Sequence, residues 1–167
     1  MGTDIHLFVE HRVGPGAQYV SLSGGQINLP RDYAVFAALA GVRTEARPHF
    51  PPRGFPEDAS ADAHTRYYSR ISEEGLDHDG WWFLERPADA RRYVESGLSH
   101  TKVWRDLELV SDPDAHHASW LLGGEVLAAL ERAGLAPDQL APEYRVVVAA
   151  LDLLADRDAR VVFWFDN

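Results

Sequence analysis

The sequence predicts an α+β fold, a single domain with a mixed or antiparallel sheet that includes the N- and C-terminal strands and carries helices packed on it. Segments with the period of strands and segments with the period of helices alternate irregularly, without a repeating βαβ unit. The length of 167 residues is typical of one domain. Because no linker or change in composition divides the chain, we expect one α+β domain over residues 1–167.

The chain begins with an expected hairpin and helix. Apolar residues alternate over Thr3 to Val13, which predicts a half-buried strand. After a Gly-Pro-Gly turn, Gln18 to Leu22 can return as its partner. Pro30-Arg31-Asp32 opens a helix that runs through Ala40, and Gly41 follows as a typical C-terminal glycine.

The middle of the chain is less regular, and its longest feature is a Pro-rich loop over 43–62, a length that is often functional. The further expected elements are a helical stretch over 64–71, a turn and short strand over 76–84, a helix from 87 that Gly97 stops, a strand over 103–110, a polar loop over 111–119, and helices over 125–133 and 142–154.

The last segment, Arg160 to Asn167, is an unbroken apolar run, which usually lies inside a sheet covered on both faces. We expect it beside the first strand, because an exposed apolar edge invites aggregation. Period two places Val162, Trp164 and Asp166 on one face. Asp166 is then expected near Asp4 or His6, where it would complete a metal site or fix the tautomer of His6.

Composition excludes several classes of protein. The formal net charge is −10, which disfavours a binder of duplex nucleic acid. The absence of Cys excludes disulfides and thiolate zinc sites and suits a reducing compartment. No stretch has the length of a membrane span, and the N-terminus does not read as a secretion signal. We therefore expect a cytoplasmic protein without a membrane partner.

Two groups of polar residues are candidate metal ligands or acid–base groups. Asp4 and His6 point to the same face of the expected first strand, about 7 Å apart at Cα. Asp114 and His116 lie in a loop dense in carboxylates and imidazoles, Asp112-Pro113-Asp114-Ala115-His116-His117. A solvent-facing strand edge and an Asx turn are the structural alternatives to these functional interpretations.

A third candidate group is basic. Arginines cluster around the first helix and the Pro-rich loop, and guanidinium groups bind carboxylate or phosphate in a bidentate manner. Ordinary ion pairs with neighbouring acidic residues explain them equally well. The cluster consists of Arg31, Arg43, Arg47 and Arg53. Two weaker candidates are the turn-like Asp77-His78-Asp79-Gly80 and the terminal Asp166-Asn167.

Taken together, five motifs resemble a group of small uncharacterised proteins that are frequent in bacteriophages and prophages and also occur in bacterial genomes. They stand in the same order over residues 2–167: Gly2-Thr3-Asp4-Ile5-His6-Leu7, Arg31-Asp32-Tyr33-Ala34-Val35-Phe36 with Ala40-Gly41-Val42-Arg43, Pro52-Arg53-Gly54-Phe55-Pro56, Asp114-x-His116 with Ser119-Trp120-Leu121, and Val162-Phe163-Trp164-Phe165-Asp166-Asn167.

The resemblance supplies no activity, but it implies which residues belong to recurring motifs: Asp4, His6, Arg43, Arg53, Asp114, His116 and Ser119. The family's loop usually reads Asp-Gly-His-Ser-x-Ser-Trp-Leu. Ala115 and His117 depart from that pattern, so His117 carries less weight than His116. Polar residues that recur on one strand and in a remote loop are explained if they meet in a shared pocket.

Three hypotheses follow. In the first, the chain is a hydrolase for a small phosphate-bearing, nucleotide-like ligand. Asp4, His6, Asp114 and His116 bind a divalent metal (Zn, Mn or Fe) or act as acid–base groups, and Arg31, Arg43, Arg53, Ser119 and Trp120 bind the ligand. In the second, it is a non-catalytic protein that binds a host protein, through an aromatic patch such as Trp81-Trp82-Phe83, or sequesters a ligand. In the third, the motif residues only form internal hydrogen bonds.

Overall fold

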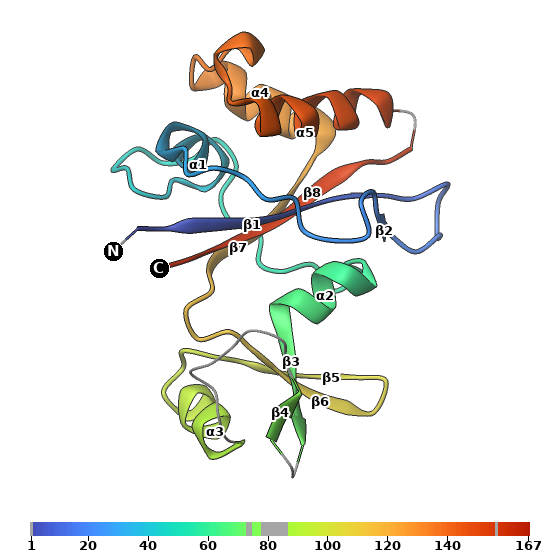
Figure 1. The fold of residues 1–167 in the computed structure, drawn as a ribbon, viewed down its shortest axis with the longest axis vertical. Coiled ribbons are helices and arrows are strands. Elements are labelled where there is room, and N and C mark those ends of the chain that lie inside the picture. The colour runs from blue at the N-terminus through green and yellow to red at the C-terminus, as the bar shows by residue number, and fades with distance from the viewer. Residues whose placement is uncertain (1, 73–74, 78–86, 156) are drawn as a thin grey trace. The chain divides into compact units, whose positions relative to one another are not determined.

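The computed structural model describes residues 2–72, 75–77, 87–155 and 157–167. The contacts between residues divide the chain into two compact units, residues 1–63 with 116–167 and residues 64–115. Within the described residues each unit contains a four-stranded antiparallel sheet. The α+β class is therefore confirmed, with both terminal strands in one sheet (Figure 1).

The first unit is built around a sheet of order β2-β1-β8-β7. Its strands are β1 (Asp4–His11), β2 (Val20–Ser21), β7 (His116–Leu122) and β8 (Arg160–Asp166), and its helices are α1 (Tyr33–Ala40), α4 (Gly123–Arg132), the short 3-10 helix η1 (Pro137–Gln139) and α5 (Pro142–Leu153). The start of α2 (Ala61–Tyr67) also falls in this unit.

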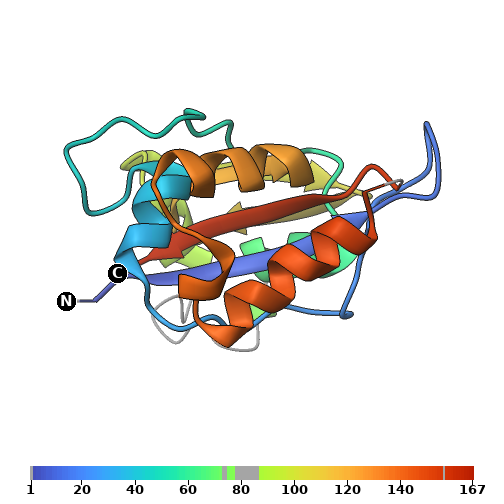
Figure 2. The same ribbon diagram turned by 90° about the horizontal axis from the view of Figure 1, so that it is seen from above.

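The central strand of this sheet is β8, as the apolar run predicts. It lies between β1 and β7, antiparallel to both, with Ile5 opposite Phe165 and Leu7 opposite Phe163. Phe163 and Phe165 are fully buried. They belong to the core between this face of the sheet and α1, α4 and α5, which lie together over it (Figures 1 and 2).

The other face of the sheet is also buried, because the end of the Pro-rich loop lies against it. Trp164 is 2% exposed and makes an edge contact with Phe55. Glu10 accepts a hydrogen bond from the Ser60 backbone N–H, at 2.7 Å. The prediction that Val162, Trp164 and Asp166 share one face agrees with these contacts, since Trp164 stacks on His6 and Phe8 of β1.

The predicted first helix is confirmed, and its ends have the expected chemistry. The Asp32 side chain accepts hydrogen bonds from the backbone N–H groups of Ala34 and Val35, which satisfies donors that a helix start leaves open. Gly41 ends the helix with a φ of 71°, in the left-handed region that favours glycine.

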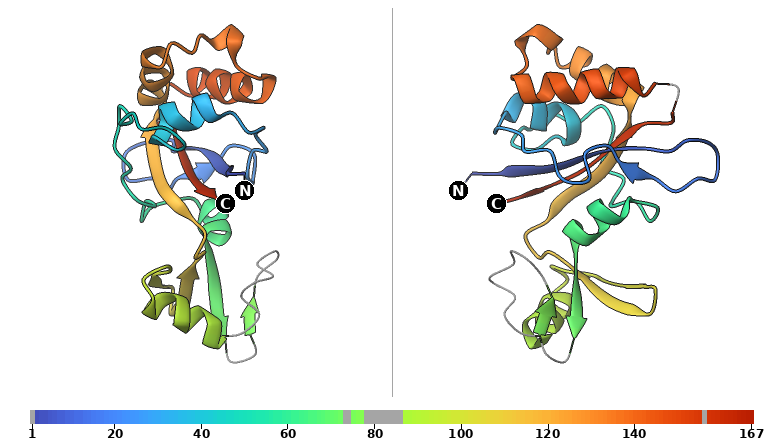
Figure 3. Two further views of the ribbon diagram at one scale, coloured as in Figure 1. Left: turned by 90° about the vertical axis from the view of Figure 1, so that its left-hand side faces the viewer. Right: turned by 45° about the vertical axis from the view of Figure 1, so that its right-hand side comes forward.

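The second unit contains the sheet β4-β3-β6-β5. Its elements are the end of α2, then β3 (Tyr68–Ser72), β4 (Gly75–Asp77), α3 (Pro87–Glu95), β5 (Thr101–Trp104) and β6 (Leu107–Ser111). Figure 3 shows these elements in two further views. Among the described residues, no helix of either unit has the length and apolarity needed to cross a membrane.

Three of the expected elements differ in the structure. The helical stretch over 64–71 ends at Tyr67, and the chain continues as β3. The single strand over 103–110 is a hairpin, because Arg105 and Asp106 form a turn with φ of 50° and 64° although neither is glycine. The polar loop over 111–119 ends early, since β7 begins at His116. The part of the strand expected over 76–84 that follows Asp77 lies outside the described residues.

A buried histidine in the second unit makes stability depend on pH. His64 is 2% exposed and stacks on Trp104 at 4.8 Å. Burial, with a smaller effect of the Lys102 charge, lowers the pKa of His64 from 6.5 to about 4. The folded state therefore favours the neutral ring, and between about pH 6.5 and 4 the unfolded state binds a proton that the folded state does not.

We expect the free energy of unfolding to fall as the pH drops through this window, by at most about 3 kcal/mol for this group. Urea unfolding at pH 7, 6 and 5 measures it, and His64→Gln should flatten the slope. An equal slope in the variant would contradict the assignment. His100 and His116, whose pKa values burial also lowers, account for a residual slope in the same direction.

Candidate functional site

Most of the sequence-predicted site residues of the first unit lie at one end of its sheet. There β1 begins, β8 ends and β7 begins: Asp4 is opposite Asp166, and His116 is opposite Phe165. The polar side chains at this end form two clusters. One lies on the face that carries Trp164, and the other lies on the face that carries Phe165.

On the Trp164 face, His6 is the central residue. Its Nε2 lies 2.8 Å from Oδ2 of Asp166, and its Nδ1 lies 2.8 Å from Oε1 of Gln26. The ring stacks on Trp164 with centroids 5.2 Å apart. The His6 side chain is 12% exposed and that of Asp166 is 32% exposed. The expected approach of Asp166 to His6 is therefore observed.

Asp4 and Arg31 form the second pair on this face. Arg31 donates from Nε and from a terminal nitrogen to the two carboxylate oxygens of Asp4, at 2.6 and 2.8 Å. These hydrogen bonds, with the Arg31 charge, hold the pKa of the Asp4 carboxyl below its ordinary value. Asp4 lies opposite Asp166, and two like charges in that position repel. Arg31 offsets that repulsion at Asp4, and His6 offers Asp166 a partner.

Gly2 lies close to the guanidinium group of Arg31. A Cβ at Gly2 would lie 2.0 Å from a terminal nitrogen of Arg31. A larger residue at that position would push the guanidinium away from Asp4.

On the Phe165 face, a hydrogen-bonded chain joins the two ends of the sequence. Arg43 donates from Nε to Oγ1 of Thr3 at 2.9 Å, and Thr3 donates to Oδ1 of Asn167 at 3.0 Å. Arg43 also approaches Oδ1 of Asn167 at 3.5 Å. Thr3 is fully buried. These contacts fasten the loop after α1 to the terminal strands.

His116 lies on the same face. Its ring stacks on Phe165 with centroids 6.0 Å apart, and its Nδ1 lies 2.8 Å from Nδ1 of His117. Its Nε2 is buried and makes no hydrogen bond within the described chain. Burial first, and then the neighbouring His117, lower the pKa of His116, so the neutral ring is favoured.

The four predicted ligands Asp4, His6, Asp114 and His116 are not gathered at one point among the described residues. His6 and His116 lie opposite consecutive residues of β8, Trp164 and Phe165, whose side chains point to opposite faces. Asp114 belongs to the second unit, where its backbone N–H donates to Oδ1 of Asp112 in an Asx turn. No group of three His, Asp or Glu residues that could hold a metal ion occurs in the described ranges.

Arg53, Ser119 and Trp120 fasten the Pro-rich loop to β7. The Arg53 guanidinium donates to both oxygens of Glu125 at 2.6 and 2.7 Å and lies 4.6 Å from the centroid of Trp120. The Arg53 backbone N–H donates to Oγ of Ser119, and the Gly54 N–H donates to the Ala118 carbonyl. The side chains of Arg53 and Ser119 thus make internal contacts, and the partner of Arg53 is the distant Glu125 rather than an acidic residue of the Pro-rich loop.

Sequence reasoning missed Gln26, which contacts His6 from the loop between β2 and α1. A single amide in a Ser- and Gly-rich loop gives no pattern that could have identified it. His78, Asp79 and Gly80 of the weaker candidate, and the aromatic patch Trp81-Trp82-Phe83, lie outside the described residues.

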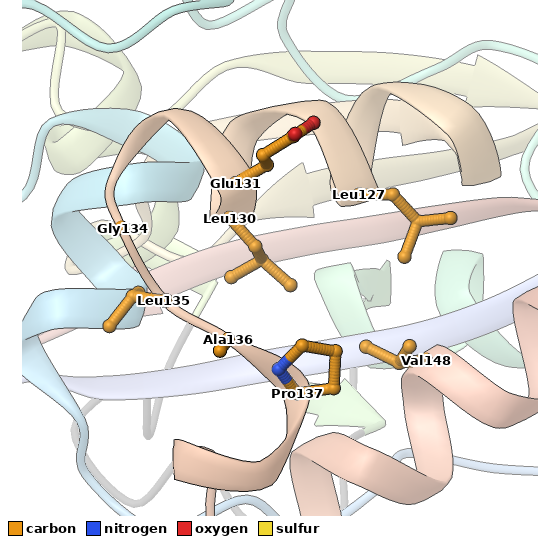
Figure 4. Close-up of a pocket in the computed structure, with 8 residues that line it drawn as sticks. All are labelled: Leu127, Leu130, Glu131, Gly134, Leu135, Ala136, Pro137 and Val148. Atoms are coloured by element: carbon orange, nitrogen blue, oxygen red, sulfur yellow. The ribbon is translucent and has the colours of Figure 1, made fainter.

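An apolar groove of about 490 Å³ lies between α4, η1 and α5 (Figure 4). Leu127, Leu130, Leu135 and Val148 line it together with one charged residue, Glu131. None of the sequence-predicted site residues lines this groove.

Comparisons of the chain with protein-family models, with curated proteins and with solved structures found no match. Function is therefore inferred from the geometry of the chain itself.

Proposed function

We propose that the chain is an acid–base hydrolase for a small phosphate-bearing ligand, with His6 as the acid–base group. The observation that carries this proposal is the 2.8 Å contact between Nε2 of His6 and Oδ2 of Asp166. A carboxylate on one ring nitrogen orients a histidine and fixes its tautomer, so that the other nitrogen can transfer protons. Of the two forms predicted from the sequence, the acid–base form has this geometric support.

The second ring nitrogen, Nδ1, lies 2.8 Å from Oε1 of Gln26, an amide oxygen that can only accept a hydrogen bond. In the proposed reaction a water molecule takes the place of Gln26 at the neutral ring, whose proton stays on Nε2 beside Asp166. Nδ1 then accepts a proton from water as the water oxygen attacks phosphorus. The bond from phosphorus to the leaving oxygen breaks, and the same proton passes to that oxygen. Arg31, about half exposed and beside Asp4, supplies a guanidinium for the phosphate.

The test is turnover of phosphate monoesters, phosphate diesters and nucleotides by the purified protein. His6→Gln is expected to lower kcat/KM by about 100-fold or more. His49→Gln, a change at an exposed ring, is the matched control and should leave it unchanged. Loss of activity with an unaltered Tm supports a role in the site. No turnover by the parent protein, or equal turnover by His6→Gln, would refute the hydrolase.

The second candidate function is a non-catalytic protein that binds the same ligand. One observation favours it: both ring nitrogens of His6 already have hydrogen-bond partners, and Asp4 already holds Arg31 through two hydrogen bonds. It predicts saturable binding of a nucleotide without turnover, weakened by Arg31→Gln. If His6 is only structural, His6→Gln lowers stability by about 1–3 kcal/mol instead and no ligand is bound.

A further inference from the structure

A pocket of about 410 Å³ lies at the opposite end of the first unit's sheet, where β1 and β7 end and β8 begins. None of the residues of the His6 cluster lines it. Its base is Arg160, which is 3% exposed, and its walls include Tyr19 and Trp120. The mouth carries three carboxylates, those of Glu57, Asp58 and Asp158.

The two arginines of the pocket are already neutralised by the protein. Arg160 donates from Nε to the fully buried Glu10 at 2.8 Å and from a terminal nitrogen to Oδ1 of Asp58 at 2.8 Å. Arg12 pairs with Oδ2 of Asp158. An anionic ligand would have to displace one of these carboxylates and leave it unpaired. The pocket is therefore poorly suited to phosphate.

The negative charge of the pocket exceeds its positive charge. Once Glu10 is matched with Arg160 and Asp158 with Arg12, the carboxylates of Asp58 and Glu57 remain in excess. The Asp58 side chain is 62% exposed, and only its Oδ1 accepts a side-chain hydrogen bond within the described chain. Its Oδ2 can accept another from a ligand.

A separate observation concerns the hydroxyl group of Tyr19. Tyr19 lines the pocket and is 7% exposed, yet its hydroxyl makes no hydrogen bond to any described residue. Burial raises the pKa of Tyr19, which keeps the phenol neutral and able to accept a hydrogen bond from an N–H group. The hydroxyl does not belong to the fully buried atoms without a partner, so it is accessible from the pocket.

We propose that this pocket binds a small organic cation, an alkyl amine or an alkyl guanidinium. Its head group is held by the free oxygens of Asp58 and Glu57 and by the Tyr19 hydroxyl. Its alkyl chain lies against the apolar wall of Trp120, Pro56 and Leu122. The Tyr19 ring already contacts the Arg160 guanidinium at 3.5 Å, and the Trp120 ring contacts that of Arg53 at 4.6 Å. The oxygen atoms, rather than the ring faces, therefore hold the head group.

The experiment is calorimetric titration with agmatine and putrescine at low salt. Butyrate, which has the same chain length as putrescine, and inorganic phosphate serve as anionic controls. We expect agmatine or putrescine to bind with a Kd at or below the millimolar range, more weakly as salt screens the charges. Undetectable binding of both cations, or equal binding of either anion, would overturn the proposal.

Variants then assign the binding to this pocket. Glu57→Gln with Asp58→Asn keeps both shapes and the hydrogen bond to Arg160, and should weaken agmatine binding by about tenfold or more. Tyr19→Phe should weaken it several-fold. The matched control, Asp138→Asn with Asp152→Asn, removes two negative charges at another groove of the same unit and should change Kd by less than about twofold. Equal weakening by the control pair would mean that only net charge is sensed, and the site would be rejected.

Discussion

Removal of residues 160–167 is expected to abolish cooperative unfolding of the protein. These residues form β8, which lies between β1 and β7 and whose residues 160–165 are at most 3% exposed. The deletion removes the hydrogen-bond partners of two strands and the centre of the core. Circular dichroism during heating should show no sigmoidal transition in the truncated protein.

Two single substitutions show how large a loss of unfolding free energy to expect at a buried and at an exposed position. Phe163→Ala empties a fully buried position and should cost about 3–5 kcal/mol. Leu153→Ala changes a side chain that is 82% exposed and should stay within about 0.5 kcal/mol. A truncated protein that unfolds cooperatively near the parent temperature would show that β8 is peripheral.

The second large effect is expected at Arg160. Arg160→Met leaves the fully buried carboxylate of Glu10 without its ion pair, which typically costs about 3–5 kcal/mol. Glu10→Gln in the same chain removes the uncompensated charge and can keep the hydrogen bond from the Ser60 N–H. The double variant should therefore recover most of the loss.

Urea unfolding of the parent, both single variants and the double variant measures this coupling. A loss of less than about 1 kcal/mol in Arg160→Met, or additive losses in the double variant, would contradict a coupled buried pair.

The elements that the sequence predicted correctly are those with a strong local signal. Three elements could be predicted from residues that are adjacent in the sequence. They are β1 with its period-two pattern, β8 with its apolar run, and α1 with its capping residues. The interior position of β8 in its sheet also followed from its composition, because an apolar strand with an exposed edge invites aggregation. Composition alone does not identify β1 as its neighbour.

The elements that were missed depend on contacts between distant residues. The β5–β6 hairpin turns at Arg105 and Asp106, which do not have the usual glycine signal of such turns. The sequence at the start of β7 is typical of a polar loop, because His116 and His117 have polar rings. A bulge before Ser119 also interrupts the alternation expected of a strand. Pairing with β8 stabilises this segment as a strand, and no local pattern reveals that partner.

The candidate site was predicted in part for the same reason. The approach of Asp166 to Asp4 or His6 was expected from the strand period together with the placement of the last strand beside the first, and the register brings it to His6. The meeting of His6 with His116 could not be judged without the register of β7 on β8, and that register places the two rings opposite consecutive residues of β8. Glu10 and Arg160 interrupt apolar strands at their ends, where a polar residue is usually interpreted as a boundary rather than as a buried pair.

The most direct test of His6 as an oriented acid–base group is the pH profile of hydrolysis in the parent protein and in Asp166→Asn. This substitution keeps the size of the side chain and removes its charge. We expect the variant to have a lower kcat/KM than the parent across the pH range, because its neutral amide does not orient the His6 ring as the carboxylate does. The same profile and the same rate in both proteins would contradict the role assigned to the pair of His6 and Asp166.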